Sequence, residues 1–133
     1  MRETAVRVVL VEDDEDARLL LKTVLERANC TVQAFADADA AQQAASTCPP
    51  DVVITDLRLR GCGGSTLAAA LRERNSTRHV ALIAVTGVVE PGPEVAARFD
   101  AYLRKPVDVT LLVQLVMQLA AVSRSASPRS AVG

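Results

Sequence analysis

The residues best suited to chemistry stand directly after apolar, β-branched runs of the chain. Asp56 closes one such run, D-V-V-I-T-D at residues 51–56, and a glycine-rich loop follows it. Four more polar residues stand in the same position after other runs: Glu12, Asp13, Thr86 and Lys105. Because ligands bind at the carboxyl ends of the strands in open parallel sheets, we expect these side chains to converge on one cleft.

The residue types of this set indicate a metal-assisted reaction of a phosphate. Crowded carboxylates raise one another's pKa unless a cation neutralises them, and Mg²⁺ is a hard ion that prefers oxygen ligands. A hydroxyl and an ammonium across the cleft suit an anion with several oxygens, and an acid between metal and lysine suits phosphoryl transfer to its own carboxylate. An acid at a strand end can also mark no more than the exit into solvent. Asp14, Glu15 and Asp16 fit the first turn of a helix on charge alone.

Five strands are predicted around this set, each followed by a helical pattern. They cover residues 5–11, 31–35, 52–56, 80–85 and the residues around 101–103. The second and the last are the weakest and are expected at the edges of the sheet, whereas the other three are apolar throughout. Because parallel strands need helical crossovers, the pattern predicts an α/β fold, with a doubly wound five-stranded parallel sheet between helices.

Helices are predicted where apolar residues recur every three or four positions. In the first helix the apolar face contains Ala17, Leu20, Leu21, Val24, Leu25 and Ala28, and in the last it contains Leu111, Leu112, Leu115, Val116 and Leu119. Ser65 should cap a helix that carries Leu67 and Leu71. From Ser123 onward the chain is small, polar and unpatterned. This predicts one domain over residues 1–122 and a disordered tail over residues 123–133.

The composition is that of a single-domain cytoplasmic protein. Of the 133 residues, 50% are hydrophobic and 23% charged, and the net charge is −1, so no basic excess favours nucleic acid. No apolar run has the length of a membrane span, and no secretory signal is expected. Cys30, Cys48 and Cys62 lack metal-ligand spacing and are expected as free thiols. The single histidine, His79, argues against a multi-histidine metal site.

Four segments in register resemble the receiver domain of two-component response regulators. They are V-L-V-E-D-D at residues 9–14, V-V-I-T-D-L-R-L at 52–59, A-L-I-A-V-T-G at 81–87 and F-D-A-Y-L-R-K-P at 99–106. Each alone would be a weak signal, but the four together are specific, and the likeness extends from residue 5 to about residue 122. The resemblance implies a flavodoxin-like sheet with the strand order 2-1-3-4-5.

The resemblance also implies roles for the residues at the strand ends. It makes Asp56 the acceptor of a phosphoryl group from a phosphohistidine, carried by a sensor histidine kinase or a histidine phosphotransfer protein. Glu12, Asp13, Asp56 and the backbone carbonyl of Arg58 would hold Mg²⁺. The domain would catalyse only its own phosphorylation and slow dephosphorylation, so it is not expected to be an enzyme in the usual sense.

Further residues would serve the conformational switch of the family. Thr86 and Lys105 would contact the phosphoryl oxygens, and Tyr102 would swing inward when Thr86 does. The bond between Lys105 and Pro106 resembles the family's cis peptide, which proline makes accessible. Phosphorylation would thereby switch the conformation and alter contacts with a downstream protein.

The chain departs from the family's pattern in two regions. Arg60 stands where proline is usual after the acceptor, and Gly63 stands where an acid is common, so a looser loop is expected. The segment from Thr86 to Lys105 is about one helical turn shorter than usual and contains P-G-P at residues 91–93, so the fourth helix should be stunted or absent.

This shortening bears on oligomeric state. Many receivers dimerise through the face built from the fourth helix, the last strand and the last helix, and a shortened helix removes part of that face. A monomer or weak dimer is therefore expected, in which activation reshapes residues 88–97.

Three alternatives to a phosphorylated receiver domain can be compared with the sequence. A haloacid-dehalogenase phosphatase needs a second acid two residues after the nucleophile, and Arg58 occupies that position. A dinucleotide-binding domain needs glycines after the first strand, where this chain has acids. A receiver-like scaffold that acts without phosphorylation stays open as the alternative, because retaining these residues shows competence and does not prove use. The partner kinase and the output are not predicted by the sequence.

Overall fold

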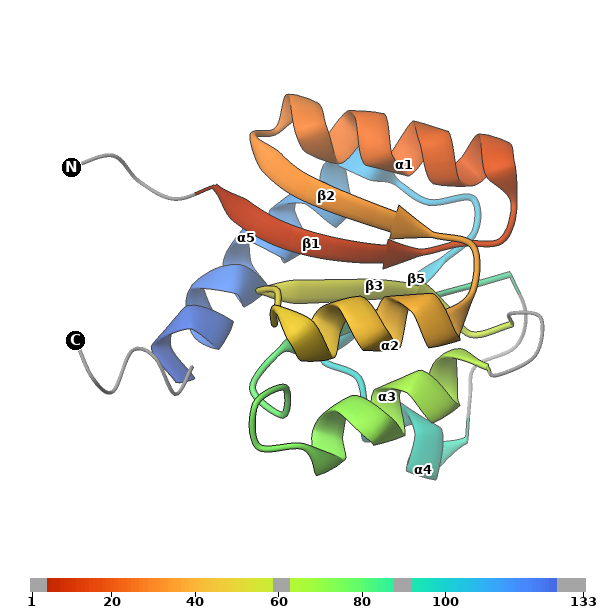
Figure 1. The fold of residues 1–133 in the computed structure, drawn as a ribbon. Coiled ribbons are helices and arrows are strands. Elements are labelled where there is room, and N and C mark those ends of the chain that lie inside the picture. Colours follow the sequence, from red (N-terminus) through yellow and green to blue (C-terminus); the bar gives the residue numbers. More distant parts are fainter. Residues whose placement is uncertain (1–4, 59–62, 88–91, 127–133) are drawn as a thin grey trace, which may run out of the picture.

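The chain folds around a parallel sheet, described in a computed structural model for residues 5–58, 63–87 and 92–126 (Figure 1). The strands are β1 (Val6–Val11), β2 (Cys30–Phe35), β3 (Val52–Asp56), β4 (Ala81–Thr86) and β5 (Ala101–Arg104). They pair in the order β2-β1-β3-β4-β5, and every pairing is parallel. This confirms the predicted flavodoxin-like fold, with the two weaker strands at the edges.

Helices cover both faces of the sheet. They are α1 (Glu15–Arg27), α2 (Ala38–Thr47), α3 (Gly64–Glu73), α4 (Pro93–Ala96) and α5 (Val109–Ala126). Figure 1 shows α1 and α5 on one face, and α2, α3 and α4 on the other. This arrangement makes the sheet doubly wound.

Two separate cores follow from the alternation of side chains along each strand. Along β1, Val8 and Leu10 face α1 and α5, whereas Val9 and Val11 face α2 and α3. Because both faces are covered, all residues of β3 and β4 are buried. At the edge, β2 instead alternates buried and exposed residues over its first four positions, as predicted for a strand half in water.

Two leucines predicted on core-facing stripes are exposed. Leu20 of α1 and Leu111 of α5 both point to solvent, while the buried residues of α1 are Leu21 and Leu25. Each exposed leucine lies at the margin of its stripe, one position before a buried leucine, and one position turns a helix by about 100°. The apolar face of each helix is therefore wider than the part of that face that packs against the sheet.

The start of α3 also differs from its prediction. The N-cap is Gly63, and Ser65 lies inside the first turn instead of capping it. The reason is a close approach: the amide of Gly64 donates to the carbonyl of Leu57 at 3.3 Å, so the helix begins as soon as the chain returns to the end of β3. By contrast, α1 and α2 are capped by aspartates, Asp14 and Asp37, whose side chains accept from backbone amides.

The fourth helix is a single turn, as predicted. It runs from Pro93 to Ala96, with Gly92 as its N-cap and proline in its first turn. A proline at the first helical position starts a helix well because its missing N–H would have no partner there. Residues 88–91, part of the segment expected to change on activation, lie outside the described residues.

The last helix is longer than predicted. It continues to Ala126, so residues 123–126 are helical and not part of a disordered tail. Arg124 anchors this last turn: its Nε and Nη2 bind the carboxylate of Asp51 at 3.0 Å each, and Nη2 also donates to the carbonyl of Ala5 at 2.9 Å. An unpatterned run can thus be helical when one long side chain holds it to the sheet. Residues 127–133 lie outside the described residues.

By length and composition α5 could cross a membrane, although the sequence was expected to contain no such run. Its 18 residues have a mean hydropathy of 1.4. In the structure, however, Leu112, Val116 and Ala120 are buried in the core against the sheet. We therefore assign α5 as a core helix of the fold.

Removing the anchor of α5 should destabilise the fold. Arg124→Ala is expected to lower the free energy of unfolding by about 2 kcal/mol, because it leaves the mostly buried carboxylate of Asp51 without its bidentate partner. Urea denaturation measures the change. Arg27→Ala, an exposed arginine at the end of α1, is the matched control and should change stability by less than about 0.5 kcal/mol. Equal stability of the two variants would contradict the anchoring role.

Candidate functional site

The polar residues predicted to converge do meet at the carboxyl edge of the sheet. Asp56 is the last residue of β3 and Thr86 the last of β4, while Glu12 follows β1 and Lys105 follows β5. The strand register brings them level, since Asp56 pairs with Val85 and Thr86 pairs with Arg104.

One ammonium group joins two buried carboxylates at this edge. Lys105 Nζ lies 2.6 Å from Asp56 Oδ2 and 3.1 Å from Glu12 Oε1. The remaining oxygens accept from backbone amides: Asp56 Oδ1 from Arg58 N at 2.9 Å, and Glu12 Oε2 from Asp14 N at 3.1 Å. Glu12 is 2% and Asp56 7% exposed, so both carboxylates are held in one orientation by hydrogen bonds.

The pKa of Lys105 reflects this setting. Burial lowers it, but the hydrogen bonds and charges of Asp56 and Glu12 outweigh burial, so the pKa lies above the usual value for lysine. The ammonium therefore stays protonated at neutral pH. A permanent cation is thus kept beside the Asp56 carboxylate.

Glu12, Asp13 and Asp56 could together bind a metal ion. Each offers one carboxylate oxygen, and these oxygens lie within 4.8 Å of one another. Three carboxylates share one ammonium, that of Lys105, so negative charge is in excess at the cluster, and a divalent cation would neutralise it. Glu12 and Asp56 are buried whereas Asp13 is partly exposed, so water can reach one side of the cluster. Hard oxygen donors beside water fit the coordination habits of Mg²⁺.

Thr86 lies beside this cluster on the neighbouring strand. It is buried at the end of β4, and its carbonyl accepts from the amide of Lys105 at 2.9 Å. This bond fixes where the chain leaves β5 and therefore where the lysine side chain begins. The buried Thr86 and the backbone of Lys105 are thus held together at the edge of the sheet where Asp56 lies.

Tyr102 and Pro106 lie on the β5 side of the site. The ring of Tyr102 is exposed and tilted against that of Phe99, with the centroids 5.9 Å apart. The inward swing predicted for Tyr102 stays a prediction, since the structure has the ring in one position. The Lys105–Pro106 bond is cis, as predicted. For Arg58, the structure shows an amide on Asp56, and the proposed role of its carbonyl stays a prediction.

Arg18 belongs to the site although no sequence pattern marked it. From α1, its Nη1 donates to the backbone carbonyl of Glu12 at 2.9 Å, which fixes the turn that carries Glu12 and Asp13. A basic residue shortly after a run of five acids was the signal that could have identified it. Its guanidinium also places a second positive charge near the acidic cluster.

One protein family matches most of the chain. The response regulator receiver domain family matches residues 8–117. The chain is 33% identical over 120 residues to the sensor histidine kinase GacS of Pseudomonas protegens and 30% identical over 112 residues to the response regulator protein PilR of Pseudomonas aeruginosa. These alignments cover 86% and 83% of this chain, but only 13% and 25% of the two relatives, so the chain spans a small part of their length.

Solved structures share the fold. A CheY-like response regulator receiver domain from Methylobacillus flagellatus superposes with a TM-score of 0.80 at 28% identity, covering 87% of this chain and 99% of that one. A sensor protein from Polaromonas sp. JS666 superposes with a TM-score of 0.81 at 26% identity, covering 90% and 99%.

The contact between α3 and the end of β3 generates a prediction. A Cβ on Gly64 would overlap the backbone carbonyl of Asp56 and approach Cα of Leu57 to 3.1 Å. Gly64→Ala should therefore displace α3 from β3 and lower the stability by about 1–3 kcal/mol, measured by chemical denaturation. Gly92→Ala is the control, because a Cβ there meets nothing within 4 Å. Two variants of equal stability would contradict the steric argument.

Proposed function

Because this chain belongs to the response regulator receiver domain family, we propose that Asp56 accepts a phosphoryl group from a phosphohistidine. The donor is a sensor histidine kinase or a histidine phosphotransfer protein. One observation carries the proposal: the Asp56 carboxylate lies 2.6 Å from the Lys105 ammonium, within a cluster of acids that fits a divalent cation. The family as a whole accepts phosphate and is not a class of conventional enzymes.

The residues at the site have separate roles in this transfer. An oxygen of Asp56 attacks phosphorus as the bond from phosphorus to the donor imidazole breaks, and the freed imidazole is the leaving group. Lys105 shifts from the carboxylate to a phosphoryl oxygen, and the Thr86 hydroxyl donates to another. Mg²⁺, held by Glu12, Asp13, Asp56 and the carbonyl of Arg58, would neutralise charge on the transferred group. The domain catalyses only this transfer to itself and the slow hydrolysis of its own aspartyl phosphate, in which water accepts the phosphoryl group.

Buried charge supports this assignment over a structural role. An ion pair that serves stability alone would balance its charges, because uncompensated buried charge costs free energy. At this edge three carboxylates meet one ammonium, and Glu12 and Asp56 are almost fully buried. Binding of a divalent cation would remove the imbalance before the anionic phosphoryl group arrives.

Output is proposed to pass to a downstream protein. Phosphorylation adds about −1.5 to −2 charges at Asp56, which Thr86 and Tyr102 convey to the elements packed around them. With α4 reduced to one turn, the face formed by α4, β5 and α5 offers little surface for a symmetric dimer. The protein is therefore proposed to be a cytoplasmic monomer or weak dimer that activation does not dimerise through this face.

Light scattering with and without beryllofluoride, a stable mimic of the aspartyl phosphate, tests this proposal. A shift to dimer on activation that is abolished by substitutions in residues 95–102 would refute it.

Asp56 should be the one phosphorylated residue. Incubation with acetyl phosphate and Mg²⁺ is expected to add the mass of one phosphoryl group to Asp56, the carboxylate of the acidic cluster that lies closest to the Lys105 ammonium, at 2.6 Å. Glu12 lies at 3.1 Å from the same ammonium and is almost fully buried. Asp56→Asn, which keeps the size of the side chain, should add none. Labelling that persists in Asp56→Asn would move the acceptor elsewhere. A wild-type protein that takes up no phosphate, even from a phosphorylated kinase, would favour the scaffold that acts without phosphorylation.

Metal binding and phosphoryl contact should be separable by mutation. Asp13→Asn removes a carboxylate and should weaken Mg²⁺ binding by about tenfold, measured by calorimetry without any phosphate donor. Lys105→Ala should leave Mg²⁺ binding at least as tight, because it removes a cation that competes for Asp56 and Glu12, yet phosphorylation should be impaired. If both variants lose Mg²⁺ binding alike, the proposed division of roles is wrong.

A further inference from the structure

A cleft lies at the edge of the sheet opposite the acidic site. It has a volume of about 420 Å³ and lies between the C-terminal half of α5, the loop before β4 and the loop before β5. Its apolar lining comes from Ala81, Ala97, Leu119 and Val122, and its polar lining includes Arg78 and Ser123. None of these residues belongs to the phosphorylation site.

Ser123 places a buried hydroxyl in the wall of the cleft. The residue is 3% exposed, and its Oγ has no hydrogen-bond partner among the described residues. Two positions on, Ser125 donates to the carbonyl of Ala121 at 3.2 Å, so a hydroxyl in this helix can satisfy itself against the backbone. Burying an unsatisfied hydroxyl destabilises a protein, and alanine would fit the same stripe as Ala120. The described residues therefore give this hydroxyl no hydrogen-bond partner, whereas a ligand in the cleft would supply one.

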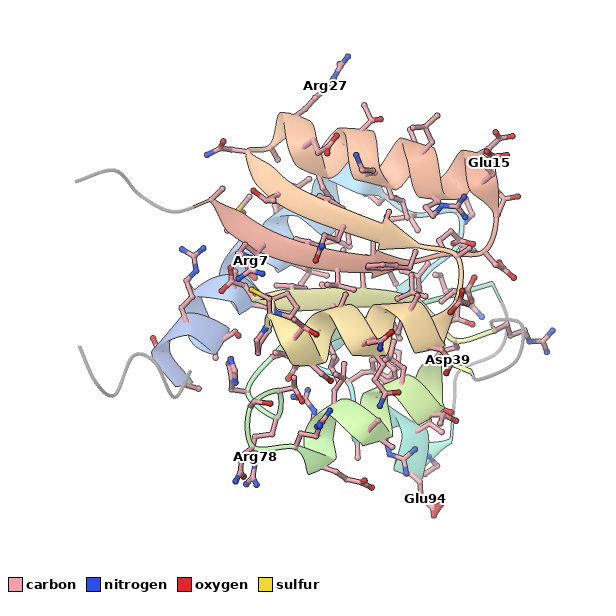
Figure 2. All side chains as sticks on the ribbon, viewed as in Figure 1. Arg7, Glu15, Arg27, Asp39, Arg78 and Glu94 are labelled. Carbon is pink, nitrogen blue, oxygen red and sulfur yellow. The ribbon has the colours of Figure 1, made fainter. Side chains whose placement is uncertain are left out.

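Basic side chains lie at the edge of the sheet that contains the cleft, and one of them, Arg78, lines it. Figure 2 shows Arg7, Arg27 and Arg78 near the edge where the strands begin, and Glu15, Asp39 and Glu94 near the opposite edge. Within the described residues, Arg78 makes no ion pair, and its Nη2 meets only the side-chain amide of Asn75. Asp100 also lines the cleft, but its carboxylate is engaged by Arg72 at 2.9 Å and by the amide of Leu82 at 2.8 Å.

We propose that this cleft is a docking site for an acidic segment of a partner protein, in which a carboxylate side chain stands next to an aliphatic one. The carboxylate pairs with the guanidinium of Arg78, the Ser123 hydroxyl donates a hydrogen bond, and the aliphatic residue covers Leu119 and Val122. Charge complementarity favours an acidic occupant, since the guanidinium is exposed and the nearest carboxylate is neutralised. Val122 is 64% exposed, which calls for an occupant that extends beyond the cleft, as a polypeptide does.

The proposal does not depend on phosphorylation of Asp56. The cleft lies at the amino ends of β4 and β5, whereas Asp56 lies at the carboxyl end of β3. Failure of either proposal would therefore leave the other standing.

Two blocked pentapeptides test the chemistry of the occupant. Acetyl-Ala-Leu-Glu-Leu-Ala-amide and its glutamine counterpart are titrated into the full ¹⁵N-labelled chain, and amide shifts are followed by NMR at low salt. The glutamate peptide should bind about tenfold more tightly, with shifts at Arg78, Ala97, Val122 and Ser123, and should weaken as salt is added. Asp56→Asn protein should bind it equally well.

Matched variants assign the contacts. Arg78→Gln should abolish the preference for glutamate, whereas Arg27→Gln, the same charge change on α1, should leave it intact. Ser123→Ala should weaken binding several-fold, yet the melting temperature of the free protein should stay the same or rise, because an unsatisfied hydroxyl is removed.

Three outcomes would overturn the proposal. They are equal binding of the glutamate and glutamine peptides, shifts that lie outside the cleft or are absent at millimolar peptide, and a clear fall in the melting temperature of Ser123→Ala. The last would show that the hydroxyl serves the fold.

Discussion

The ion pair between Lys105 and Asp56 is the contact on which the site depends. Without the ammonium, the buried carboxylates of Asp56 and Glu12 would repel each other in a poorly solvated edge of the sheet. The fold brings Lys105 to both carboxylates from a distant part of the chain. Lys105 follows β5, Asp56 ends β3 and Glu12 follows β1, and in the sheet β3 and β4 lie between β1 and β5. The parallel order of the strands and the reach of one lysine therefore determine the geometry together.

Backbone groups make this arrangement rigid before any ligand arrives. The amides of Asp14 and Arg58 each hold a carboxylate oxygen, and Arg18 holds the carbonyl of Glu12. Such preorganisation means that binding of cation and phosphate reorders little of the surrounding protein. The Lys105 side chain is the member of the cluster with most room to move, since it is 33% exposed.

Strand ends were predictable because apolar runs and turn residues carry local physical signals. The strand order and the shortened fourth helix were predicted from the resemblance to receiver domains, the latter together with the P-G-P run at residues 91–93. The predictions failed where a tertiary contact decided the outcome. Ser65 does not cap α3, because the approach of Gly64 to β3 starts the helix earlier. Residues 123–126 are helical because of Arg124 and its contact with Asp51, a partner 73 residues away that no local pattern indicates. Arg18 was missed for a different reason: its partner, Glu12, is only six residues away, but the contact is with a backbone carbonyl and not with a charged side chain.

The residue that anchors α5 and the central residue of the site lie at opposite ends of β3. Asp51, which holds Arg124, immediately precedes β3, and Asp56 is the last residue of that strand. The five residues of β3 span roughly 17 Å as a stiff, fully buried rod. The last turn of α5 thus binds, through Arg124 and Asp51, to the start of the strand that ends in Asp56. A displacement of β3 along its axis would therefore shift Asp56 and the last turn of α5 together.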